Sequence, residues 1–207
     1  NVITHNEVGV FYNELDNSDF GSVIANDNGA LSVGAYGWHG NNALSLLQKA
    51  YSISNAEISR VALSYSNTGR KVIAAITNGS DWSSYVPDSY TCSCIKAMLL
   101  TNAGIEAQNQ TSTENAEEYI AICQEHNIND KRAIVYCADI LNQFGTGSFD
   151  KNVYGNGHNG VLYGVSNATL DSVYSSKRAW SDSNYSYETR RKWTYDYLKG
   201  LSDTDFS

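Results

Sequence analysis

The pair Asn28-Gly29 is the sequence feature that most constrains this fold. It stands between two short segments, 23–25 and 31–35, where apolar residues alternate with small or polar ones. Both Asn and Gly tolerate positive φ, so the dipeptide predicts a tight β-hairpin. Downstream of Trp38 the apolar residues follow helical spacing instead. The sequence therefore predicts a mainly α fold with one small hairpin.

Apolar residues spaced three and four apart predict helices along most of the chain. A first helix or helical turn would cover 3–15 and carry Glu14 near its C-terminal end, and Asn41 is a candidate N-cap for the next helix. A further helix is expected to start at Thr111 or Thr113. The others are expected over 55–66, 70–77, 89–103 with its end at Gly104, 131–144, 167–178 and 185–199.

The segment 131–144 is apolar around nearly its whole circumference, which predicts a buried central helix. Its polar residues Asp139, Asn142 and Gln143 form one stripe, because they are spaced three and four apart. That stripe either forms a satisfied internal network or faces a cleft. In the last helix, the basic residues 190–192 are most simply a solvated face.

Length and charge exclude several classes of protein. We expect one domain over residues 1–207, either a processed form or a domain cut from a longer protein because the chain starts at Asn1 without Met. No apolar stretch approaches the roughly 18 residues of a membrane span, so no membrane role is expected. The net charge is −8 and Lys and Arg form no long block, so nucleic acid is not an expected partner.

The chain has four cysteines in segments with helical spacing: Cys92, Cys94, Cys123 and Cys137. Buried free thiols are favoured, although three disulfide pairings are open. Cys92 and Cys94 project to different sides of a helix and His126 is distant from them in sequence, so no zinc pattern emerges. We expect neither a metal nor another cofactor.

Glu14 and Asp27 are the candidate catalytic pair. Glu14 is close in sequence to Phe11 and Phe20, and partial desolvation would favour its protonated form, whereas Asp27 in a polar turn should stay ionised. A protonated and an ionised carboxyl together hydrolyse glycosidic bonds. With room for a water between them, Glu14 would be the general acid, Asp27 the general base, and Ser32 would hold the water. This arrangement predicts that hydrolysis inverts the configuration at the anomeric carbon.

The N-terminal motifs resemble lysozyme-like domains of bacterial and phage cell-wall hydrolases, which resemble in turn the chitosanases of the lysozyme superfamily. The resemblance implies that a glutamate ending the first long helix donates a proton and that an aspartate of a small sheet activates water. Glu14 and Asp27 occupy those places, and Ser32 corresponds to the hydroxyl residue that follows the aspartate. The matching segments are 20–34, which contains Asn26-Asp27-Asn28-Gly29-Ala30-Leu31-Ser32-Val33-Gly34, then Trp38-His39-Gly40 with Ala43-Leu44 and Leu46-Leu47, and more weakly 138–143 and 188–195.

One position departs from the resemblance. A Gln is expected before Trp38-His39-Gly40, but the chain has Gly37, which puts substrate affinity or fine specificity in doubt. Three further acids remain open as substitutes for their neighbours in the catalytic pair: Glu7, Asp16 and Asp19.

Aromatic residues are candidates for substrate binding, since sugar faces stack on rings. The chain contains 15 Tyr and 4 Trp, of which Tyr36, Trp38 and Tyr154 are the best candidates, although each is also an ordinary core or surface residue. Tyr154 lies in the Gly-rich stretch 145–164, which is either a connection or a binding edge. His39 is a better candidate for a hydrogen-bonding scaffold residue than for a catalyst.

The sequence therefore predicts a mainly α, two-lobed lysozyme-like fold with a small hairpin beside the cleft. Its expected substrate is a β-1,4-linked amino-sugar polymer: peptidoglycan first, and chitosan second because the acidic chain favours a cationic polymer. An inactive sugar-binding domain is the alternative from another class. We expect a monomer that is secreted or associated with a cell wall, of bacterial or phage origin.

Overall fold

The computed structural model describes residues 2–145, 167–175 and 185–206. The chain forms two compact units, one of Ile3–Glu114 and one of Val2 with Asn115–Ser207. The boundary lies inside α7 (Asn102–Glu125), and each unit has its own hydrophobic core. The described residues are mainly helical with one three-stranded antiparallel sheet, which confirms the expected mainly α class. That residues 1–207 form a single lysozyme-like domain stays a prediction.

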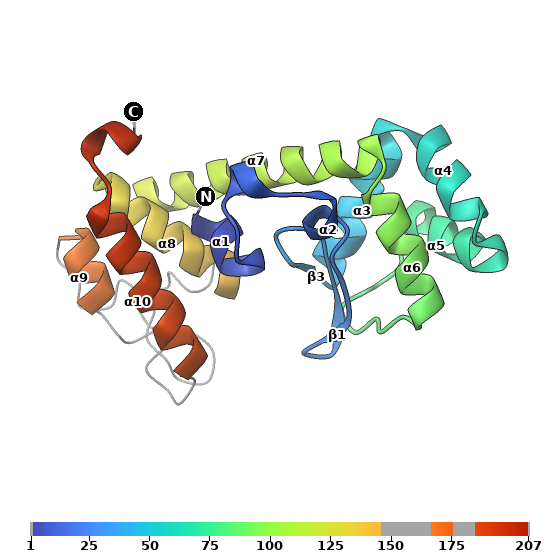
Figure 1. Ribbon diagram of the computed structural model, residues 1–207, viewed down its shortest axis with the longest axis horizontal. Helices are drawn as coiled ribbons and strands as arrows, with labels where there is room; N and C mark the ends of the chain where they lie inside the picture. Colours follow the sequence, from blue (N-terminus) through green and yellow to red (C-terminus); the bar gives the residue numbers. More distant parts are fainter. Residues whose placement is uncertain (1, 146–166, 176–184, 207) are drawn as a thin grey trace. The chain divides into compact units, whose positions relative to one another are not determined.

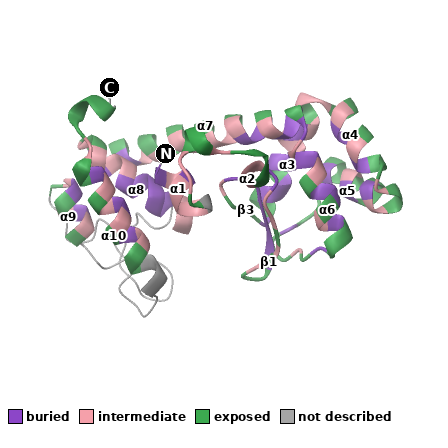
Figure 2. Ribbon diagram, in the orientation of Figure 1, coloured by how far each residue is buried: buried purple, intermediate pink, exposed green. Residues whose placement is uncertain are grey.

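The first unit combines the sheet with a group of helices. Helices α3 to α6 pack against one another, while α3 contacts β2 and β3 and α6 contacts β1 (Figure 1). The inward faces of these helices are buried and their outer faces exposed, as amphipathic helices require (Figure 2). In chain order the elements are α1 (Val2–Val8), η1 (Tyr12–Glu14), α2 (Asn17–Phe20), β1 (Val23–Asp27), β2 (Ala30–Val33), β3 (Trp38–His39), α3 (Asn41–Ile53), α4 (Asn55–Leu63), α5 (Ser66–Asn78) and α6 (Ser89–Leu99).

The predicted hairpin is confirmed. Asn28 and Gly29 form its two-residue turn with φ values of 52° and 98°, the positive values that a tight turn between twisted strands requires. The register changes within β1, because Ile24 pairs with Ser32 whereas Asp27 pairs with Ala30. Regular pairing would have placed Asp27 opposite Gly29. A bulge of this kind changes the direction of a side chain, here that of Asp27.

The single helix expected over 3–15 is wrong. Helix α1 ends at Val8, and the next residue, Gly9, has a φ of 83° that a right-handed helix cannot continue. Glu14 consequently lies in the short 3-10 helix η1. A separate short helix, α2, follows because Asp16 caps it, accepting from the backbone N–H of Ser18 at 2.6 Å.

The helix end expected at Gly104 is also wrong. Helix α6 stops at Leu99, and the Thr101 hydroxyl accepts from the N–H of Gly104 at 2.9 Å, which places Gly104 in the first turn of α7. A Cβ at Gly104 would lie 2.4 Å from the carbonyl oxygen of Met98. Glycine is therefore needed for the close approach of two helices, and α7 runs on through 111–113, where a new helix was expected.

The second unit contains helices α8 (Lys131–Phe144), α9 (Leu170–Ser175) and α10 (Tyr185–Gly200), followed by η3 (Asp203–Phe206). The three helices contact one another pairwise. Helix α8 has the bounds predicted for the buried central helix, and residues 136–141 are all buried. Of the Gly-rich stretch 145–164 only Gly145 belongs to the described residues, so the predictions for its aromatic residues, Tyr154 included, lie outside them.

The polar stripe of α8 forms an internal charged network, as one of the two sequence alternatives predicted. Asp139 is 0% exposed; its carboxylate accepts from Arg190 at 2.6 Å and also from Arg191, which in turn donates to Gln143. The solvated face expected at 190–192 is wrong for Arg191, which is buried, whereas Lys192 is exposed. Burial lowers the pKa of Arg191, and the Asp139 carboxylate opposes that shift. Pairing is what permits these charges in the core.

The four cysteines are free thiols in helices, as favoured. Cys94, Cys123 and Cys137 are buried, and burial raises the pKa of Cys94 to about 11. Among the helices of the described residues, none combines the length and apolar character needed to cross a membrane.

Candidate active site

The sheet brings together three of the residues singled out from the sequence. The Ser32 hydroxyl donates to Asp27 Oδ2 at 2.7 Å, and His39 Nε2 donates to the backbone carbonyl of Asp27 at 2.7 Å. Each residue comes from a different strand, and Ser32 pairs with His39 in the register of β2 and β3. The carboxylate and the backbone of Asp27 are thus held by separate partners.

These contacts define the role of each residue. Asp27 is half-buried and its Oδ1 accepts from the Asn28 side chain at 3.1 Å, so the carboxylate is oriented but stays partly accessible. Ser32 is buried, and it orients the carboxylate directly, whereas the sequence interpretation had it hold a water. His39 is exposed and its ring bonds to the main chain of Asp27, which fits the scaffold role expected for it.

A buried amide that the sequence interpretation missed supports this sheet. Gln108 of α7 is 0% exposed, and its Oε1 accepts from the N–H of Ala35 at 3.1 Å. Its Nε2 donates to the carbonyls of Phe20 at 3.2 Å and Leu99 at 3.3 Å. A Cβ at Gly34 would lie 2.5 Å from Gln108 Oε1, so the chain after β2 approaches the amide closely. A sequence pattern that could have indicated this burial is the set of small residues Ala103, Gly104 and Ala107, which allow the helix to pack closely in that region.

Glu14, the proposed acid, lies at the end of η1 in the same unit. Its Oε2 accepts from the backbone N–H of Phe11 at 2.9 Å, which closes the short helix. The side chain is exposed. The desolvation expected from its apolar neighbours is therefore not provided by the described residues, and Tyr12 beside it is also exposed.

The other acids near the pair have identifiable positions. Asp16 and Asp19 cap α2, since Asp19 Oδ2 accepts from the N–H of Asp16 at 2.9 Å. Glu7 lies in the last turn of α1, and its Oε2 is 3.4 Å from where a Cβ at Gly37 would stand. Capping accounts for the first two acids, whereas Glu7 beside the Gly37 turn remains a substitute for Glu14.

Gly37 has a physical reason for replacing the expected Gln. Its φ is 66°, and its N–H donates to the Gly34 carbonyl at 3.3 Å in the turn that leads to β3. A side chain at such a φ is strained, so this turn favours glycine.

Of the aromatic candidates, Trp38 is placed in the core. It is 6% exposed and belongs to the buried cluster of the first unit, which leaves almost none of its ring for a sugar. Tyr36 is half-buried, with its ring centroid 5.2 Å from that of Trp38. Tyr36 is thus still partly accessible. The stacking role predicted for Trp38 is wrong, because its ring is buried in the core.

Among the described residues, no group of three or more His, Cys, Asp and Glu is arranged to hold a metal ion. Comparison with protein-family models, with curated proteins and with solved structures found no match for this chain.

Proposed function

We propose that this protein is a lysozyme-like glycoside hydrolase that cleaves β-1,4 bonds of peptidoglycan as an N-acetylmuramidase. The observation that carries the proposal is the hydrogen bond of 2.7 Å between Ser32 and the Asp27 carboxylate on a bulged hairpin. A half-buried carboxylate with one oxygen fixed by a hydroxyl is prepared to accept a proton from a water. The N-terminal resemblance supplies the substrate class.

In the proposed mechanism the two carboxyl groups act on opposite sides of the scissile bond. Asp27 accepts a proton from the attacking water, whose oxygen bonds to the anomeric carbon, while Glu14 donates a proton to the departing glycosidic oxygen. The product is expected to have the inverted configuration at its anomeric carbon. Because Glu14 is exposed, the bound polymer must exclude water from it for the acid to be effective.

Chitosan is the second candidate substrate. The net charge of −8 favours association with a cationic polyamine sugar over an anionic cell wall. Both carboxylates come from one unit, so a monomer suffices for either substrate. Such an enzyme would be secreted or act at a cell wall, as a bacterial or phage product.

Product analysis tests the proposal. Peptidoglycan and chitosan are incubated side by side with the protein, and mass spectrometry identifies the new reducing end. An end on muramic acid supports the muramidase, and an end on glucosamine supports the chitosanase. No new end from either polymer would favour the non-catalytic sugar-binding domain.

Substitutions assign the roles. Glu14→Gln and Asp27→Asn should each lower the cleavage rate about 10²- to 10⁴-fold, since each removes one proton-transfer group. Glu7→Gln tests the substitute acid and should retain activity if Glu14 is the acid. If Glu14→Gln digested the polymers as fast as the parent, Glu14 could not be the acid, and loss with Glu7→Gln would transfer that role to Glu7.

Ser32→Ala tests the observation that carries the proposal. Without its hydroxyl donor the Asp27 carboxylate is less well oriented, and the expected loss of cleavage rate is about tenfold, the worth of one hydrogen bond to a charged group. An unchanged rate would remove Ser32 from the site.

A further inference from the structure

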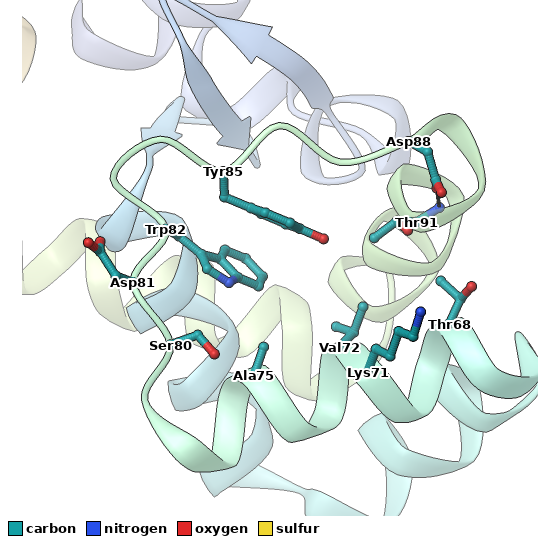
Figure 3. Close-up of a pocket in the computed structure, with 10 residues that line it drawn as sticks. All are labelled: Thr68, Lys71, Val72, Ala75, Ser80, Asp81, Trp82, Tyr85, Asp88 and Thr91. Atoms are coloured by element: carbon teal, nitrogen blue, oxygen red, sulfur yellow. Dashed lines mark hydrogen bonds between the residues drawn. The ribbon is translucent and has the colours of Figure 1, made fainter.

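The first unit contains a hollow of about 370 Å³ whose lining does not include Asp27. It lies between α5, the loop 79–88 and the start of α6 (Figure 3). Its volume is in the range of ~300–1,000 Å³ that small-molecule sites occupy. The residues that line it are Thr68, Lys71, Val72, Ala75, Ser80, Asp81, Trp82, Tyr85, Asp88 and Thr91.

Two stacked aromatic rings form one side of the hollow. The rings of Trp82 and Tyr85 are 4.8 Å apart at an interplanar angle of 29°. Trp82 is 3% exposed, whereas Tyr85 is half-buried and its ring extends over the hollow, facing Val72 and Ala75 of α5 (Figure 3). This leaves a flat apolar surface beside an opening, a shape that suits the face of a pyranose ring.

Polar groups stand at one end of the same hollow. Asp88 caps α6 by accepting from the N–H of Thr91 at 2.7 Å, and that hydrogen bonding lowers the pKa of Asp88, so its carboxylate is ionised. The Lys71 ammonium lies close enough to contribute to that shift. Burial, and then the Asp88 carboxylate, raise the pKa of Tyr85, so its phenol stays a donor. Hydroxyl and amine groups of a sugar can bond with all three.

The backbone of the aromatic pair is held in place by β2 and by the first residue of α3. The Tyr85 carbonyl accepts from the N–H of Leu31 at 2.8 Å, and the N–H of Trp82 donates to Asn41 Oδ1 at 2.7 Å. Leu31 precedes Ser32 in β2. Asp81 points away from the hollow in Figure 3, and it fixes the loop by accepting from Asn41 at 3.0 Å. The hollow is therefore preformed.

We propose that this hollow binds one hexosamine ring of the polymer substrate, with the sugar face on Tyr85 and its polar groups on Lys71 and Asp88. For the identity of the polymer the proposal rests on the proposed function; the geometry of the hollow is independent of it. The site adds affinity for the polymer without contributing a group that reacts. The same chemistry, a β-1,4-linked 2-amino-2-deoxyglucose ring, occurs in peptidoglycan and in chitosan.

Calorimetric titration with two probes tests the site: chitohexaose, with free amines, and N-acetylchitohexaose. The Asp27→Asn protein is used so that neither probe is consumed. Tyr85→Ala should weaken binding of the preferred probe about tenfold by removing the stacking surface. Tyr90→Ala is the matched control, since Tyr90 is 52% exposed near the start of α6 and does not line the hollow. It should bind as the parent does.

Two more variants separate a lost site from a lost fold. Tyr85→Phe keeps the ring and should retain most of the affinity, while Ser80→Tyr fills the hollow without removing a packed side chain and should also weaken binding about tenfold. Equal affinity of Tyr85→Ala, Ser80→Tyr and the parent would overturn the site, as would failure of both probes to bind.

Cleavage by the parent protein is measured separately, so the two proposals can fail independently. Tyr85-dependent binding without cleavage supports the sugar site and contradicts the hydrolase. If the parent cleaves the polymers but Tyr85→Ala and Ser80→Tyr leave the binding affinity unchanged, the hydrolase is supported and the sugar site is contradicted. Preference for the acetylated probe indicates a peptidoglycan-like ligand, and preference for the free amine indicates chitosan.

Discussion

Two aspartates in the two units show opposite ways of placing a carboxylate. Asp27 lies on a hairpin, half-buried, with neutral partners that leave part of it accessible. Asp139 lies on α8, fully buried, with two arginines around it. The first arrangement leaves a carboxylate that a ligand can reach. The second uses both carboxylate oxygens inside the protein, so we assign it to stability alone.

The largest expected effect is at Asp139. Asp139→Asn leaves Arg191 buried beside a neutral amide, and the free energy of unfolding should fall by about 3–5 kcal/mol. Chemical denaturation measures this change in the free energy of unfolding. Asp171→Asn is the control: Asp171 forms an exposed pair with Lys199 at 3.1 Å, and because solvent screens such a pair its loss should destabilise the protein far less than Asp139→Asn. Equal effects of the two substitutions would contradict the contrast between a buried charged network and an exposed ion pair.

Gln108 should give the next largest effect. Gln108→Leu leaves the Ala35 N–H and the carbonyls of Phe20 and Leu99 without this partner, at a cost of about 1–3 kcal/mol. Its measurement is the denaturation midpoint, with Gln110→Leu as the control because Gln110 is exposed on the same helix. Removing the neutral buried amide should thus cost less stability than removing the charge of Asp139. A larger loss for Gln108→Leu than for Asp139→Asn would contradict this expectation.

Asp27→Asn should hardly change stability. The His39 bond goes to the backbone carbonyl and survives, and Ser32 can donate to the new amide oxygen, so the free energy of unfolding should change by less than about 0.5 kcal/mol. Thermal unfolding checks this, and a loss as large as that of Asp139→Asn would make Asp27 structural. Combined with lost cleavage, an unchanged melting temperature would identify Asp27 as functional.

The smallest effect concerns the exposed cap Asp88. Its pKa is lowered from 3.8 in the folded state, so its contribution to stability is present above pH 3.8 and is lost as pH falls through the lower folded value. Asp88→Asn keeps a cap acceptor but cannot titrate. Stability of the variant, followed by circular dichroism, should therefore decline less steeply below pH 3.8 than that of the parent. Parallel curves would show that Asp88 does not take part in acid unfolding.

Local patterns predicted what local physics decides. The hairpin turn followed from the tolerance of Asn28 and Gly29 for positive φ, and α8 followed from its apolar circumference. The errors in helix bounds were at glycines. The helical segment expected over 3–15 spans Gly9, whose positive φ ends α1, whereas Gly104 was expected to end a helix and lies within one, because its role depends on the Met98 carbonyl of a neighbouring helix.

The sequence by itself determined the hairpin, the helical class and the association of Ser32 with Asp27, since those two residues lie five positions apart on one hairpin. That β3 brings His39 to them came from the structure. Only the tertiary structure decided that Trp38 is core, that Arg191 is buried against Asp139, and that Trp82 and Tyr85 line a hollow. Burial and ion pairing depend on residues distant in the chain, and no local pattern records which distant partner a side chain meets.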